Sequence, residues 1–124
     1  MENLTIHKTT KSPKVKLDVS GLIEISGNSL LENTQSFFSP ILDWIKDYVK
    51  HPANETIVNF AMDYYNTSSQ MWIFQLFNAL TDLFRLEKKI TVNWYYTDID
   101  LRESGEDLAH LLNIKLNFIE KEAE

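Results

Sequence analysis

The stretch "TIVNFAMDYYNTSSQMW" (residues 56–72) changes its hydrophobic period near the middle, and this change indicates the fold. Before Asn66, apolar and polar side chains alternate, which predicts a strand with an apolar face made of Val58, Phe60, Met62 and Tyr64. After Asn66, large apolar residues recur at helical spacing, which predicts a helix that continues to about Arg85. We therefore predict a strand that passes directly into a helix.

The rest of the chain repeats this alternation of strands and helices. The other predicted elements are a hairpin in "VKLDVSGLIEIS" (residues 15–26), a helix with Ser39 as N-cap and Pro40 in first position, a strand over 90–96, a short helix around Leu108 and a strand over 114–119. Strands joined through helices are normally parallel, whereas hairpin strands are antiparallel. The sequence therefore predicts a single α/β domain over residues 1–124, with a mixed sheet, helices packed on it and one sheet face only partly covered.

The composition is that of an acidic globular protein. Of the 124 residues, 44% are hydrophobic and 24% are charged, which is close to the globular average, and the formal net charge is -6. Such a charge disfavours binding to nucleic acid or to an anionic membrane surface. The lysines of "KTTKSPKVK" (residues 8–16) indicate a solvated hairpin edge rather than a basic patch. Without a signal peptide or a membrane-spanning run, we expect a cytoplasmic protein.

The sequence contains few motifs that indicate catalysis. Cysteine is absent, which excludes thiolate chemistry and disulfides. The chain has neither a phosphate-binding loop of the P-loop type nor a G-x-S-x-G nucleophile motif. His7, His51 and His110 do not have metal-ligand spacing. We therefore predict a protein that is not an enzyme and that uses no cofactor and no metal.

Residues 98–107 ("DIDLRESGED") are strongly acidic and are predicted to form a loop. The first interpretation is a solvated loop in which Glu103 or Glu106 favours a helix N-terminus. Contact with a partner is a second interpretation, and a divalent cation site is a third. The EF-hand pattern fails, however, because the sixth position counted from Asp98 is Glu103 rather than glycine, and the third position counted from Asp100 is Arg102 rather than an oxygen ligand.

Three consecutive hydroxyl residues, Thr67, Ser68 and Ser69, lie where the strand meets the helix. In one interpretation Thr67 is the N-cap and forms a capping box with Gln70. In the other, one hydroxyl is a covalent switch, because a helix N-terminus at the carboxyl edge of a sheet is receptive to phosphate. A phosphate adds about -1.5 to -2 charges, which disfavours a partner at the same point without unfolding the domain.

Three longer stretches together carry a family resemblance. "ISGNSLLENTQSFFSPILDWIKDY" (residues 25–48), "YYNTSSQ" (64–70) and "VNWYYTDIDLRESGED" (92–107) occur in this order. They resemble the SiaC family of bacterial regulatory phosphoproteins, through the motifs G-x-S, E-N, F-F-x-P, D-W, Y-x-N-T-S-S and the late G-E segment. Family members look like relatives of the STAS domains that act as anti-sigma factor antagonists. The sequence differs from the family pattern at Leu31, where the family often has proline.

The resemblance implies a function for this chain. It implies that Thr67 is phosphorylated by a dedicated Ser/Thr protein kinase and dephosphorylated by a PP2C-type phosphatase. In the family, the dephosphorylated form binds and activates a diguanylate cyclase, which raises cyclic di-GMP and promotes biofilm formation. Asn66, Ser68 and Ser69 match the motif around the phosphosite, and are expected to shape it. Glu32 and Asn33 match the loop before the first long helix; partner contact, loop structure and capping are all compatible with these two residues.

Two alternatives belong to other functional classes. The same edge of the sheet is compatible with a small enzyme or ligand-binding module that uses Asn66, Ser68 and the acidic residues. It is also compatible with a scaffold that acts without phosphorylation, in which the three hydroxyls only cap the helix. In that case Thr67→Ala costs about 0.5–2 kcal/mol of stability through the lost cap.

Overall fold

The computed structural model describes residues 1–86 and 88–122. Within these ranges the chain forms, in order, β1 (Leu4–Ile6), β2 (Lys14–Asp18), β3 (Leu22–Ser29), α1 (Thr34–Tyr48), β4 (Glu55–Tyr65), α2 (Thr67–Arg85), β5 (Lys89–Tyr96), α3 (Ile99–Leu112) and β6 (Asn117–Glu120). The predicted strand–helix junction near Asn66 is confirmed.

The strands form one mixed sheet in which the spatial order is the chain order, β1 to β6. β1, β2 and β3 pair antiparallel, whereas β3, β4, β5 and β6 pair parallel. The predicted mixed α/β sheet and its hairpin are therefore confirmed. The lysines of residues 8–16 are all exposed, as predicted, but β2, which carries Lys14 and Lys16, pairs with both β1 and β3 and is therefore not an edge strand.

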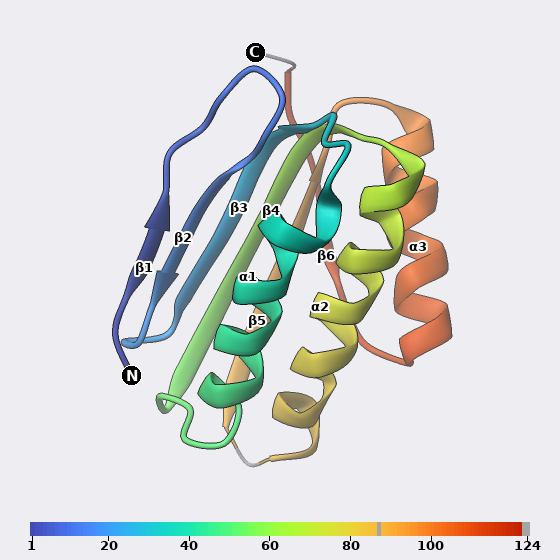
Figure 1. The fold of residues 1–124 in the computed structure, drawn as a ribbon. Helices are drawn as coiled ribbons and strands as arrows, with labels where there is room; N and C mark the ends of the chain where they lie inside the picture. The colour runs from blue at the N-terminus through green and yellow to red at the C-terminus, as the bar shows by residue number, and fades with distance from the viewer. Residues whose placement is uncertain (87, 123–124) are drawn as a thin grey trace.

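All three helices cover the same face of the sheet (Figure 1). Each right-handed crossover moves one strand further in the same direction, so each helix lies on the same side. The opposite face is lined by a row of hydrogen-bonded polar side chains: Asn117 Nδ2 donates to Asn93, Asn93 to Asn59 and Asn59 to Glu24, over 2.9–3.3 Å. No helix of the described ranges packs on this polar row, in agreement with the predicted partly covered face.

The core lies between the sheet and the helical layer. Trp94 of β5 is 1% exposed, and its ring lies 4.6 Å from that of Phe60 and 5.7 Å from that of Phe77. Its indole N–H donates to the Leu101 carbonyl at 3.0 Å, so the polar atom of this buried ring is satisfied. This aromatic cluster ties β4, β5, α2 and α3 together.

The helix α1 begins earlier than the sequence predicted. Asn33, not Ser39, is its N-cap, because the Asn33 Oδ1 accepts from the backbone N–H of Ser36 at 3.2 Å. Pro40 therefore lies inside the helix, where it cannot donate a backbone hydrogen bond. Burial of Phe38, which is 1% exposed and stacks on an aromatic ring of α2, favours the longer helix.

Residues 99–107 are helical, so the predicted acidic loop is wrong. Asp98 is the N-cap of α3, and its carboxylate accepts from the backbone N–H of Leu101 at 2.9 Å. Leu101, Gly105 and Leu108 form the buried face of this helix. Gly105 lies so close to Trp94 that a Cβ there would be 2.6 Å from the ring. Glycine in a polar segment resembles a loop in sequence, yet here it permits close helix–sheet packing.

The ends of the sheet also differ from the prediction. The sequence did not predict β1, which is three residues long. The last strand begins at Asn117 rather than at residue 114, because the chain leaves α3 through Asn113 in a left-handed conformation, φ 54°. Leu116 nevertheless remains buried, as the alternation predicted.

An irregularity near the end of β4 changes which face its side chains occupy. Consecutive residues of β3 pair with Met62 and Tyr64, so Asp63 is an extra residue of β4. Such a bulge re-aims the side chains that follow it. Tyr64 is 52% exposed, whereas Tyr65 packs against the core. The prediction that Tyr64 shares the buried face is therefore wrong.

Candidate functional site

The N-termini of α1, α2 and α3 lie at one edge of the sheet, where β3, β4 and β5 have their carboxyl ends (Figure 1). In open α/β sheets this edge is where ligands and partners bind. The sequence-predicted site residues belong to two segments of this edge, residues 32–33 before α1 and residues 66–69 at the start of α2. We call this edge the N-terminal rim.

Asn66, not Thr67, is the N-cap of α2. The Asn66 Oδ1 accepts from the backbone N–H of Ser69 at 3.1 Å. The Gln70 N–H donates to the Asn66 carbonyl at 3.2 Å, so the predicted Thr67–Gln70 capping box is wrong. The other end of the same side chain, Nδ2, donates to the Leu31 carbonyl at 3.0 Å. Because a backbone N–H can only donate and a carbonyl can only accept, both contacts orient the amide in the same way.

Ser69 is completely buried and forms part of a chain of hydrogen bonds. Its Oγ lies 2.5 Å from the Asn66 Oδ1 and 2.7 Å from the Ser29 Oγ, and both serines are 0% exposed. Since the amide oxygen can only accept, Ser69 donates its single hydroxyl proton to Asn66. Ser29 must then donate to Ser69, and the Ser29 carbonyl accepts from the Asn66 N–H at 3.0 Å. The end of β3 thus holds the start of α2.

Thr67 and Ser68 are the exposed members of the hydroxyl cluster. The Ser68 hydroxyl donates to the Asn66 Oδ1 at 3.2 Å. The Thr67 hydroxyl, by contrast, has no hydrogen-bond partner in the described part of the chain. Both residues lie in the first helical turn, where backbone N–H groups have no intrahelical acceptor and the helix dipole favours negative charge. The position is therefore accessible and suited to a phosphate.

The loop before α1 joins this site through its backbone. Glu32 and Asn33 are exposed, and Asn33 serves as the N-cap of α1. The link to α2 is the bond from Asn66 to the Leu31 carbonyl. The capping interpretation of Asn33 is confirmed, and the exposed Glu32 carboxylate borders the same edge. Sequence reasoning missed Ser29 as a site residue, although it is the serine of the G-x-S motif.

The structure reverses the stability effects expected from a Thr67 cap. Replacing Asn66 by alanine is expected to lower the free energy of unfolding by about 1–2 kcal/mol, because it removes the cap and the bond to Leu31. Replacing Thr67 by alanine is expected to change the free energy of unfolding by less than about 0.5 kcal/mol, because the side chain is exposed and has no hydrogen bond to any described residue. Urea denaturation of both variants checks this order; a larger loss in Thr67→Ala would contradict the assigned cap.

A small cleft between α2 and α3 lies next to the N-terminal rim. It has a volume of about 110 Å³ and is bordered by Tyr65, Phe74 and Leu111. Burial raises the pKa of the Tyr65 hydroxyl above its ordinary value, and a hydrogen bond with Ser104 acts in the opposite direction. Phe74 and Leu111 are 37% and 71% exposed, so the cleft opens onto an apolar surface.

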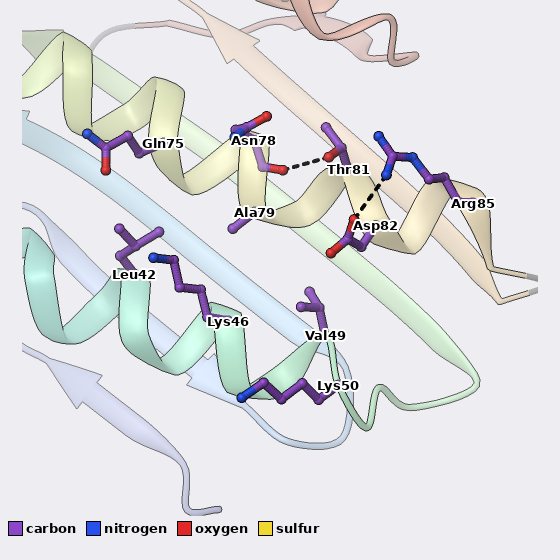
Figure 2. A pocket seen from close by; sticks show the side chains of 10 residues that line it. All are labelled: Leu42, Lys46, Val49, Lys50, Gln75, Asn78, Ala79, Thr81, Asp82 and Arg85. Carbon is purple, nitrogen blue, oxygen red and sulfur yellow. Dashed lines mark hydrogen bonds and ion pairs between the residues drawn. The ribbon is translucent and has the colours of Figure 1, made fainter.

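A larger hollow, of about 610 Å³, lies between α1 and α2 near the C-terminal end of α2 (Figure 2). Leu42 and Ala79 face the space between the helices, and Lys46 extends along it. At its far end the Arg85 guanidinium is paired with Asp82 at 3.5 Å. None of the residues that line this hollow belongs to the predicted site.

Residues 1–86 and 88–122 contain no group of three or more histidine, aspartate or glutamate side chains arranged to hold a metal ion. In the same part of the chain, every helix is too short or too polar to span a membrane.

Known proteins share this fold and sequence pattern. A curated relative, an uncharacterized protein of Pseudomonas aeruginosa strain UCBPP-PA14, is 23% identical over 97 residues, which are 77% of each chain. The crystal structure of apo-SiaC from P. aeruginosa superposes with a TM-score of 0.82 at 21% identity, and covers 99% of this chain and 100% of that one. The crystal structure of the diguanylate cyclase SiaD in complex with its activator SiaC contains a chain with a TM-score of 0.82 at 20% identity, covering 97% and 99%.

These structural likenesses establish the common fold. The family model described as SiaC family regulatory phosphoprotein matches residues 6–121, and therefore nearly the whole chain. The chain belongs to the SiaC family of regulatory phosphoproteins.

Proposed function

We propose that this protein is a non-catalytic cytoplasmic switch controlled by phosphorylation of Thr67. A dedicated Ser/Thr kinase adds the phosphate and a PP2C-type phosphatase removes it. The dephosphorylated form binds and activates a diguanylate cyclase, and thereby raises cyclic di-GMP.

One observation carries the proposal: the Thr67 hydroxyl is exposed and has no hydrogen bond within the described residues, whereas the neighbouring Ser68 and Ser69 hydroxyls are bonded to Asn66. A kinase needs such access to a hydroxyl, and the first turn of a helix accommodates the resulting charge. Phosphorylation at this position therefore changes the surface and leaves the fold in place. The family description as a regulatory phosphoprotein supports this function.

The surface beside Thr67 favours a protein partner. Met71 and Phe74 follow Thr67 at helical spacings of four and three, so the three share one side of α2. Met71 is 58% exposed and Phe74 is 37% exposed. A partner that covers these apolar side chains would bring its own atoms against Thr67. A phosphate there would then be desolvated or would meet like charge, at a cost of several kcal/mol.

The choice of a diguanylate cyclase as partner rests on the relative from P. aeruginosa. That SiaC is the activator of the diguanylate cyclase SiaD in a crystal structure of their complex. The fold of the present chain matches nearly all of it. We infer that this chain activates a cyclase through the corresponding surface.

The first experiment determines the phosphorylation state of the protein purified from its native host. Intact mass and phosphosite mapping are compared before and after treatment with a PP2C-type phosphatase. We expect a single phosphate on Thr67 that the phosphatase removes.

A chain that remains unmodified under every growth condition, with a neighbouring kinase co-expressed, would contradict the proposed switch. Turnover of a small molecule that Thr67→Ala abolishes would instead favour the enzyme alternative. Unchanged signalling by Thr67→Ala and Thr67→Glu alike would favour a scaffold that acts without phosphorylation.

A further inference from the structure

We propose that Asn66 is a positioning residue that makes Thr67 the single phosphoacceptor among the three adjacent hydroxyls. This inference rests on the proposed function, since it concerns the selectivity of the same modification. The choice among the three hydroxyls is then made in part by the structure of the phosphorylated protein, and not by recognition in the kinase alone.

The three hydroxyls differ in what they bond to, although they are consecutive in sequence. The Asn66 Oδ1 accepts from the Ser69 hydroxyl at 2.5 Å and from the Ser68 hydroxyl at 3.2 Å. The same oxygen also accepts from the Ser69 backbone N–H at 3.1 Å. One side-chain oxygen therefore engages two of the three hydroxyl protons. The Thr67 hydroxyl, by contrast, has no hydrogen bond within the described residues.

Phosphoryl transfer requires a hydroxyl that can give up its proton. The hydroxyl oxygen forms a bond to the γ-phosphorus of a nucleoside triphosphate, and the bond from that phosphorus to the bridging oxygen breaks. The nucleoside diphosphate leaves, and the hydroxyl proton passes to a base of the kinase. An amide oxygen is not such a base, so a proton donated to Asn66 must first be released from that bond. Of the three hydroxyls, only that of Thr67 can pass its proton to the kinase without first breaking a hydrogen bond to Asn66.

Ser69 is excluded by burial as well. It is 0% exposed, and its oxygen accepts from Ser29, which is also 0% exposed. To reach a kinase, Ser69 would have to leave both partners and the first turn of α2 would have to open. Ser68 is exposed, so burial does not exclude it from phosphorylation, and only its hydrogen bond to Asn66 disfavours the transfer. The sharpest effect of changing Asn66 is therefore expected at Ser68.

Two substitutions separate the role of the Asn66 side chain from helix capping. Asn66→Gly removes the acceptor oxygen and the bond to the Leu31 carbonyl, but costs less stability than alanine because glycine is a good N-cap. Asn66→Asp retains an acceptor oxygen at the same place. Asn66→Asp also loses the bond to Leu31, so it is the matched control for that loss. Each variant is produced in the native host as the full chain, and phosphate at residues 67, 68 and 69 is quantified by mass spectrometry. We expect the Ser68-to-Thr67 ratio to rise about tenfold in Asn66→Gly, as for the loss of one hydrogen bond, and to stay near the wild-type value in Asn66→Asp.

The same measurement on Thr67→Val sharpens the test. With Asn66 intact, we expect no transfer to the buried Ser69 and a transfer to Ser68 about tenfold slower than that to Thr67 in the wild type, whereas the double variant Asn66→Gly/Thr67→Val should accept phosphate at Ser68 about tenfold faster than Thr67→Val. Transfer to Ser68 in Thr67→Val at the wild-type rate of Thr67 would overturn the inference. An unchanged Ser68 ratio in Asn66→Gly would overturn it as well.

A second readout is independent of any kinase. Proton NMR should show slow exchange of the Ser69 hydroxyl proton with water in the wild-type protein and in Asn66→Asp. Exchange of the same proton should be fast in Asn66→Gly, and exchange of the Thr67 hydroxyl proton should be fast in the wild type. Fast exchange of the Ser69 hydroxyl in the wild type would overturn the role of Asn66. Absence of phosphate from every hydroxyl, by contrast, would contradict the proposed switch, so the two failures are distinguishable.

Discussion

Replacing Thr67 by glutamate is expected to weaken binding of the diguanylate cyclase at least about 100-fold, because like charge or desolvation at an interface costs several kcal/mol. The free energy of unfolding is expected to change by less than about 0.5 kcal/mol. The exposed Thr67 side chain has no hydrogen bond to lose within the described ranges. A carboxylate in the first turn of α2 also interacts favourably with the helix dipole. The loss is therefore expected in binding and not in folding.

The control for this prediction is Thr67→Gln, which adds nearly the same volume without the charge. Isothermal titration calorimetry with the purified cyclase measures both affinities, and urea denaturation measures both stabilities. We expect the glutamine variant to bind distinctly better than the glutamate variant. Equal loss in both variants would attribute the effect to size, and unchanged binding of Thr67→Glu would contradict the proposed control by charge.

Replacing Gly21 by alanine is expected to lower the free energy of unfolding by roughly 4 kcal/mol, which combines backbone strain with steric overlap. Gly21 lies in the tight turn between β2 and β3 with φ +114°, a conformation that side chains disfavour. A Cβ there would lie 2.1 Å from the backbone carbonyl oxygen of Glu55. The Ile57 N–H donates to the Gly21 carbonyl at 2.7 Å, so the turn cannot move away without disrupting the start of β4.

Gly27 provides the matched control for this substitution. Its φ is similar, +105°, but the nearest atom to an added Cβ would be the flexible Lys8 Cδ at 3.6 Å. Gly27→Ala therefore isolates the backbone strain and is expected to cost about 1–3 kcal/mol. Urea denaturation of both variants measures the difference. A Gly21→Ala variant as stable as Gly27→Ala would show that the overlap with Glu55 is relieved at no cost.

The main elements of the fold were predictable because their periods are clear. Strict alternation over β4 and β5, and helical spacing over α2, result from burial of one face in the common core. The parallel order of β3 to β6 followed from the helices that join them. The three residues of β1 are too few for any period to be visible. The helix around Leu108 was predicted, but its first part, residues 99–107, was missed because Gly105 and its acidic neighbours resemble a loop, whereas the packing of Gly105 against Trp94 depends on tertiary structure.

The N-cap of α2 was predictable only to within one residue. Asn66 and Thr67 are both good N-cap residues, so the sequence could not tell which of them caps α2. The bulge at Asp63 was equally invisible, although it turns Tyr65 rather than Tyr64 toward the core. Ser29 was missed because its role depends on a contact with Ser69, forty positions later in the chain. Local patterns carry no information about such a pairing.

The most direct test of the proposed switch compares two forms of the same protein. Protein phosphorylated only on Thr67 and its phosphatase-treated counterpart are titrated separately into the purified diguanylate cyclase, and the activity of the cyclase is followed in each mixture. We expect the dephosphorylated form to bind and activate the cyclase, and the phosphorylated form to bind at least about 100-fold more weakly. Equal affinity and equal activation by the two forms would contradict control by Thr67 phosphorylation.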